Sequence, residues 1–269
     1  MNRVFMILVF TMTTAAGITL WSGTLVAANP GHGKPGNIPP VEAMDRLKAG
    51  NEHFVAGIID PHEIGEVRRI ELTAGQHPFA VVLACADSRV PPELLFNQGL
   101  GDLFVIRVAG NVVDPVILGS MEYAVEHIGI RLVVVLGHDS CGGVQAVIDT
   151  RHNAEHNDGK HEHDADESTD ADETVPANLS LLARKIHIGD ELPDDPHDAS
   201  VIAVRRNLQH QIEAMMRNSD YLEAKTESEF LRVVPAIYHL ETGKVEWFHE
   251  LSPNDAKELH ELGHDPVAD

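Results

Sequence analysis

The chain has 269 residues, of which 43% are hydrophobic and 23% are charged. This composition is ordinary for a globular protein, and the length is enough for one α/β domain of ordinary size or for two small ones. The formal net charge of −22 argues against nucleic acid as a partner, because so acidic a surface would repel the phosphate backbone.

Residues 1–28 have the pattern of a signal peptide. A short basic region is followed by a mostly apolar stretch over 4–21, and Val26 and Ala28 place small residues at the −3 and −1 positions of a cleavage site. An uncleaved membrane anchor is the alternative, although Thr and Gly residues interrupt the apolar stretch. We therefore expect an exported protein that starts near Asn29 and has no stable membrane insertion after cleavage. In a Gram-negative bacterium it would be periplasmic.

The remaining chain is expected to contain a flexible arm at 29–39, one domain over 40–251 and a C-terminal tail at 252–269. Within the domain the hydrophobic pattern predicts, in chain order, helices 40–54 and 63–74, strand 79–84, helix 91–96, strand 103–108, helix 116–128, strand 132–136, helices 142–148 and 200–216, and strands 231–240 and 245–248. Thr242 and Gly243 predict a hairpin turn between the last two strands. Because strands alternate with helices, we expect an α/β fold in which helices flank a mostly parallel central sheet, with an N-terminal helical arm.

Residues 151–175 differ in composition from the rest of the domain. They carry nine Asp or Glu, two Lys or Arg and four His, with very few apolar side chains. This composition predicts a disordered, acidic, His-containing insertion. Its histidines could gather metal weakly or relay protons, although a solvated loop is the simpler interpretation.

Two short motifs directly follow predicted strands. Cys85-Ala-Asp-Ser-Arg comes after strand 79–84, and the sequence GHDSCG, which contains His138 and Cys141, comes after strand 132–136. Ligand sites in open α/β sheets lie at the carboxyl ends of the strands. We therefore expect the two cysteines and His138 to meet at one site.

Two thiolates and one imidazole suit a zinc ion, and three protein ligands leave a fourth position for water or substrate. Asp87 could orient that water, and Arg89 could hold the Asp87 carboxylate ionised. Two alternatives remain at this point. The only two cysteines of an exported chain could form a disulfide, or Asp87 could be a fourth ligand in a closed zinc site.

Both motifs resemble those of the beta-class carbonic anhydrases, which are C-x-D-x-R and H-x-x-C. The flanking sequences ACADSRVPPELLFNQGLGDLFVIRVAGNVV and GSMEYAVEHIGIRLVVVLGHDSCGGV resemble the family almost continuously. LKAGNEHFVAG is similar to its helical arm, and VVPAIYHLETGKVEWF is similar to its closing strands. The resemblance covers roughly 40–150 and 177–250.

The resemblance implies reversible, zinc-dependent hydration of carbon dioxide to bicarbonate and a proton by a zinc-bound hydroxide, which is a lyase reaction. The implied zinc ligands are Cys85, His138 and Cys141, with Asp87 as a fourth only in a closed form. The implied catalytic pair is Asp87 and Arg89, and the implied substrate pocket contains Gln76, Phe104, Ala109 and Tyr123. The family also implies a homodimer or a higher homo-oligomer, with an arm around 40–57 embracing the partner and Phe104 and Tyr123 contributed across the interface.

Other functions remain open on the sequence. The same site could hydrolyse a related linear molecule, carbon disulfide or carbonyl sulfide. A non-enzymatic protein could store zinc in the insertion at 151–175. A redox protein could use Cys85 and Cys141 as a dithiol.

Overall fold

The computed structural model describes residues 38–58, 64–157 and 176–248. The predicted signal peptide, most of the predicted arm at 29–39 and the tail at 252–269 lie outside these residues. In the described part of the chain, no helix has the length and apolar character needed to cross a bilayer.

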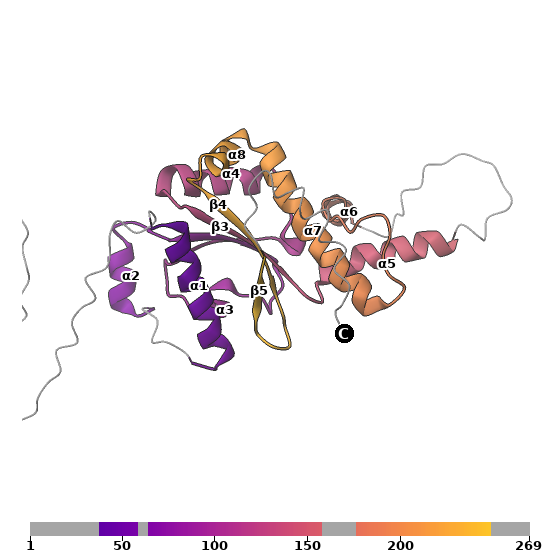
Figure 1. The fold of residues 1–269 in the computed structure, drawn as a ribbon, viewed down its shortest axis with the longest axis horizontal. Helices are drawn as coiled ribbons and strands as arrows, with labels where there is room; N and C mark the ends of the chain where they lie inside the picture. The colour runs from indigo at the N-terminus through magenta and orange to yellow at the C-terminus, as the bar shows by residue number, and fades with distance from the viewer. Residues whose placement is uncertain (1–37, 59–63, 158–175, 249–269) are drawn as a thin grey trace, which may run out of the picture. The chain divides into compact units, whose positions relative to one another are not determined.

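One five-stranded sheet organises the fold, with strand order β2-β1-β3-β4-β5 (Figure 1). Strands β2, β1, β3 and β4 run parallel to one another, and β5 is antiparallel to β4. The strands are β1 Ala80–Ala84, β2 Leu103–Arg107, β3 Leu132–His138, β4 Arg232–Tyr238 and β5 Val245–Trp247. The predicted mostly parallel α/β fold is thus confirmed, as is the hairpin between the last two strands.

Helices cover both faces of this sheet, which explains why β1 and β3 are buried throughout and why β1 and residues 132–136 of β3 are all apolar. The helices are α1 Pro40–Val55, α2 Glu66–Leu72, α3 Pro92–Leu95, α4 Pro115–Tyr123, α5 Gly142–Asn157, α6 Ala177–Ala183, α7 Pro196–Asn218 and α8 Asp220–Glu227. Two short turns, η1 Ala109–Asn111 and the π-helical η2 Ala124–Ile128, complete the described elements. One core lies between the sheet and α1 and α3, and a larger core lies on the opposite face under α4, α5, α7 and α8.

The predicted start of the disordered insertion at 151 is wrong. Helix α5 continues to Asn157, seven residues into that segment. Charged and polar residues without Gly or Pro can prolong a helix that an apolar stretch has already started. Arg151 also fixes this turn, because its guanidinium donates hydrogen bonds to the carbonyl oxygens of Gly189 and Asp190. The rest of the predicted insertion, 158–175, lies outside the described residues.

Asn51 of α1 joins three parts of the fold. Its buried side-chain amide donates to the carbonyl oxygens of Leu95 and Gly243 and accepts from the backbone N–H of Val245. We expect Asn51→Ala to lower the free energy of unfolding by about 2–4 kcal/mol, because three backbone groups lose their partner. Urea unfolding would measure the change. Asn218→Ala is the matched control, since exposed Asn218 bonds only the Ala214 carbonyl of its own helix among the contacts of the described chain. Equal stability of the two variants would contradict this role.

Candidate metal centre

The strand order places both motifs at a topological switch point. The chain leaves β1 to form β2 on one side and returns to form β3 on the other side of β1. Ala84 at the end of β1 pairs with Leu136 of β3, so Cys85, which follows β1, and His138, the last residue of β3, lie at the carboxyl ends of neighbouring parallel strands. Connections leave such a point in opposite directions and open a crevice there, which is where ligands bind in open α/β sheets.

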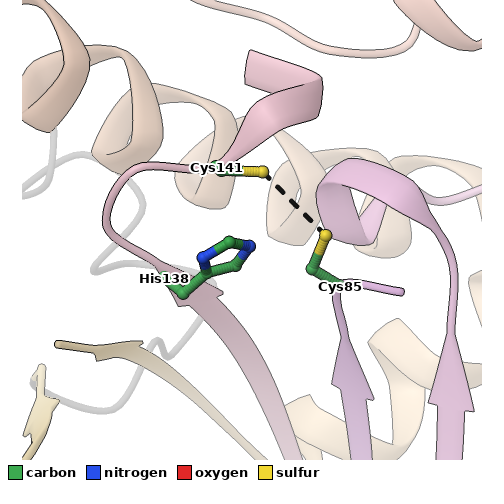
Figure 2. Close-up of side chains that lie close together, drawn as sticks. All are labelled: Cys85, His138 and Cys141. Atoms are coloured by element: carbon green, nitrogen blue, oxygen red, sulfur yellow. Dashed lines mark hydrogen bonds between the residues drawn. The ribbon is translucent and has the colours of Figure 1, made fainter. Parts of the chain in front are cut away.

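Three buried side chains converge at this edge of the sheet (Figure 2). Cys85 comes from the end of β1, His138 from the end of β3, and Cys141 from the turn before α5. Their ligand atoms all lie within 4.8 Å of one another, and the two sulfur atoms are 3.9 Å apart. Within the described part of the chain, this is the only group of three or more Cys, His, Asp or Glu side chains that could hold a metal ion.

The imidazole of His138 is oriented for a ligand. Its Nδ1 lies 2.8 Å from the backbone carbonyl oxygen of Asp139, which fixes the proton on Nδ1. Its Nε2 is buried and has no hydrogen-bond partner among the described residues. A buried polar atom without a partner is costly, so the position of Nε2 beside two sulfur atoms points to a bound ion.

The two sulfur atoms are in hydrogen-bond contact, and this contact shifts the pKa values of Cys85 and Cys141 in opposite directions. The pKa of Cys85 is lowered to about 4, chiefly because its sulfur accepts a hydrogen bond from Cys141, with further bonds from backbone N–H groups that include Gly110 at 3.3 Å. The pKa of Cys141 is raised because it donates that bond and is buried, although the N–H groups of Gly143 and Val144 oppose the rise. A divalent cation bound between the two sulfurs would displace the thiol protons and hold both as thiolates.

The donor set therefore fits zinc. Two sulfurs and one imidazole nitrogen are ligands that zinc prefers, and the unpartnered Nε2 supplies the third lone pair. The same geometry argues against a disulfide, since sulfur atoms 3.9 Å apart are not bonded and both cysteines are free.

Asp87 and Arg89 form a bidentate ion pair beside the three candidate metal ligands. Arg89 donates from Nε to Oδ1 at 3.0 Å and from Nη2 to Oδ2 at 2.7 Å. These bonds hold the pKa of Asp87 well below its usual range. Asp87 Oδ2 also lies 3.9 Å from His138 Nε2, so the carboxylate borders the ligand atoms while Arg89 restrains it. Arg89 Nη2 further donates to the carbonyl oxygen of Ser140 at 3.2 Å and so links the two motifs.

The four predicted pocket residues occupy different places. Ala109 lies in η1, next to Gly110, whose N–H reaches the Cys85 sulfur. Gln76 is exposed and precedes β1, and Phe104 pairs with Val81, four residues or roughly 13 Å along the strand before Cys85. Phe104 contacts Tyr123, with ring centroids 6.3 Å apart. The structure therefore brings Ala109 to the ligands of its own chain but does not bring Gln76, Phe104 or Tyr123 there.

Three residues of the centre were missed by sequence reasoning. Gly110 has a φ of +67°, and a Cβ there would lie 2.8 Å from Ile186, so glycine lets its N–H approach Cys85. The carboxylate of Asp139 accepts from the N–H of Leu240 at 3.1 Å and anchors the second motif to β4. Arg107 donates hydrogen bonds to backbone carbonyls of the first motif. It was not recognised because it ends an otherwise apolar strand. Its charge among apolar neighbours was the one available signal.

Comparisons with known proteins agree with this geometry. A family model described as carbonic anhydrase matches residues 80–245. Carbonic anhydrase 2 of Mycobacterium tuberculosis is 54% identical over 112 residues, which cover 42% of this chain and 54% of that protein. The match thus spans about half the length of this curated relative.

Solved structures have the same fold. The beta-carbonic anhydrase CafA of Aspergillus fumigatus is 26% identical, with a TM-score of 0.52 over 74% of this chain and 88% of that chain. A tetrameric beta-carbonic anhydrase of Sordaria macrospora is 21% identical, with a TM-score of 0.52 over 79% and 97% of the two chains. The family model alone covers more than half of the sequence. The chain belongs to the beta-carbonic anhydrase family.

Proposed function

We propose that this chain catalyses the reversible hydration of carbon dioxide to bicarbonate and a proton at a zinc ion held by Cys85, His138 and Cys141. One observation carries the proposal: the three ligand atoms converge in a buried cluster while the neighbouring carboxylate of Asp87 is held by Arg89. An arginine-bound carboxylate leaves the fourth zinc position free for a reactant. The contacts of Asp87 therefore support the open form of the site.

Bound zinc would supply the Lewis acidity that makes a coordinated water nucleophilic near neutral pH. Asp87 would accept a hydrogen bond from the O–H of the reactant water and so orient a lone pair of its oxygen toward carbon dioxide. Arg89 keeps Asp87 ionised and in position through its two bonds. The backbone N–H of Gly110 stabilises negative charge on the Cys85 sulfur, so the ligand remains a thiolate.

The test is stopped-flow hydration of carbon dioxide by the zinc-loaded mature chain, with carbonyl sulfide and carbon disulfide offered separately. We expect one tightly bound zinc per chain and turnover of carbon dioxide that is lost on chelation and restored by zinc. Hydrolysis of a sulfur compound without hydration of carbon dioxide would reassign the substrate. Tight zinc without any turnover would refute the enzymatic function.

We also propose that the active unit is a homodimer in which Gln76, Phe104 and Tyr123 line the pocket of the partner. These residues lie away from the ligands of their own chain. Beside them, α4 presents an exposed face at helical spacing that includes Val116 at 76% and Tyr123 at 46% exposure. An apolar face this exposed, on the helix that carries Tyr123, favours burial against a second copy of the chain.

Gly119 lies between Val116 and Tyr123 on this face, and a Cβ there would meet nothing within 4 Å. We expect Gly119→Arg to leave the monomer folded, to dissociate the dimer in light scattering and to lower activity at least about tenfold, because a charge would face the partner. Leu179→Glu is the control, since Leu179 is an exposed apolar residue of α6. Full activity in a monomeric Gly119→Arg chain would refute the shared pocket.

Export is proposed on the pattern of residues 1–28 alone. The mature chain recovered from its native host is then expected to begin near Asn29. N-terminal sequencing would test this, and an intact Met1 would contradict it.

A further inference from the structure

Arg107 is the last residue of β2 and pairs in register with Ala84, the last residue of β1. It is the single charged residue of the strand LFVIR. The ladder between the two strands continues just past their ends, where Val108 donates to Ala84 and Ala86 donates to Val108. The Arg107 side chain is therefore fixed at its base beside the first metal-binding motif.

Its guanidinium holds two carbonyl groups of that motif. Nε donates to the carbonyl oxygen of Cys85 at 3.0 Å, and Nη2 donates to the carbonyl oxygen of Asp87. One planar, charged group thus spans the turn that carries the first ligand and the orienting carboxylate. A guanidinium can do this because its donors form a rigid fork, which an ammonium group lacks.

Asp87 is consequently held at two points by two arginines. Arg89 binds its carboxylate, and Arg107 binds its main-chain carbonyl. Arg89 is itself tied to Ser140 of the second motif, whereas Arg107 is tied to β2. The carboxylate bonds fix where the oxygen atoms of Asp87 lie relative to Arg89, and the carbonyl bond fixes the backbone from which the side chain projects.

We propose that Arg107 is a positioning residue of the metal centre, which acts by locking the Cys85–Asp87 turn so that the Cys85 sulfur faces His138 and Cys141 while Asp87 faces Arg89. The effect on Cys85 concerns metal binding. The effect on Asp87 concerns catalysis and rests on the proposed function.

The first arm of the test measures zinc affinity by competition with a chromophoric chelator, without any assay of turnover. We expect Arg107→Met to weaken zinc binding about 10- to 100-fold and to alter the sulfur-to-metal charge-transfer band of the cobalt-substituted protein, because support of the Cys85 backbone is lost. Arg107→Lys should recover part of the affinity. It also serves as the test variant if Arg107→Met does not fold, as judged by circular dichroism.

Arg151→Met is the matched control. Arg151 also donates from its guanidinium to two loop carbonyls, those of Gly189 and Asp190, but it contacts neither metal-binding motif. Its loss should leave zinc affinity within about twofold of wild type. Wild-type affinity in the Arg107 variants, or an equal loss in Arg151→Met, would overturn the inference.

The second arm is a double-mutant cycle on the turnover of carbon dioxide at saturating zinc. We expect Arg107→Met to lower kcat about tenfold with little change in KM in the otherwise native chain, and to lower it less than about twofold in an Asp87→Asn background. Such coupling shows that Arg107 acts through Asp87, and equal losses in both backgrounds would overturn that role. If the native chain does not hydrate carbon dioxide, the proposed function fails, and zinc affinity still decides the positioning role.

Discussion

His138→Ala is expected to lose the tightly bound zinc and to reduce carbon dioxide hydration to the uncatalysed rate. His138 is 1% exposed, and its Nε2 is the one non-sulfur ligand atom of the buried cluster. Without it, Cys85 and Cys141 alone remain, and two thiolates do not complete a catalytic zinc site. Elemental analysis should show a fall from one zinc per chain to below roughly 0.1, and activity should fall by at least about 1000-fold.

His187→Ala is the matched control for this loss. His187 is an exposed histidine that stacks on His210, with ring centroids 4.7 Å apart, and it contributes no atom to the cluster. Both proteins should be washed with a mild chelator before analysis, because the four histidines of 151–175 could retain zinc loosely. Full zinc and full activity in His138→Ala would refute the assigned ligand set. Equal losses in both variants would mean that removal of any histidine disturbs the site.

The candidate ligands could be located from the sequence because parallel strands buried on both faces consist of unbroken apolar runs. The apolar run at 79–84 ends just before Cys85, and the run at 132–136 ends just before the motif that contains His138. In the structure β1 and β3 are paired in parallel, and Ala84 lies opposite Leu136, so the two runs end side by side. Along β1 and β3, polar side chains occur only at or just after the carboxyl end of each strand. The position of the candidate site thus followed from the hydrophobic pattern, and its chemistry followed from the residue types at that edge.

Other features could not be predicted because they depend on contacts distant in the sequence. Helix α8 was not predicted, and its start depends on Ser219, whose hydroxyl donates to Glu122 of α4 and accepts from the N–H of Leu222. The extension of α5 depends on the bonds of Arg151 to another loop. The role of Arg107 depends on the register of β1 and β2, which a single sequence does not reveal.

The pocket residues depend on family resemblance in a different way. The resemblance assigned Gln76 and Phe104 to the pocket and implied that Phe104 crosses a dimer interface, and the strand direction does separate both residues from Cys85 within the chain. A sequence motif records which residues a site needs, but it does not record which copy of the chain supplies them. The geometry of one chain therefore makes oligomerisation a requirement of the proposed pocket.

Asp87→Asn is expected to keep one zinc per chain while kcat falls about 100-fold or more. The substitution preserves shape but removes the charge that Arg89 binds through two side-chain bonds. The amide has one acceptor oxygen in place of two, so it cannot keep both bonds to the guanidinium and also accept from a reactant water. Because these bonds hold the pKa of Asp87 well below its usual range, the native carboxylate is ionised at every pH used for the assay. The pH dependence of native activity should therefore reflect groups other than Asp87.

Asp102→Asn is the matched control. It shows whether the expected loss of activity is specific to Asp87 or follows the removal of any carboxylate that an arginine binds. Asp102 accepts from Arg68 at 3.2 Å and from the backbone N–H of Gly99 at 2.8 Å, the same kinds of partner that Asp87 has, but it lies outside the metal-binding motifs. Its variant should keep zinc and activity within about twofold of wild type. Activity near wild type in Asp87→Asn would remove Asp87 from the mechanism. Loss of zinc with activity would instead make Asp87 a metal ligand, because a residue that only orients the reactant can be replaced without releasing the ion.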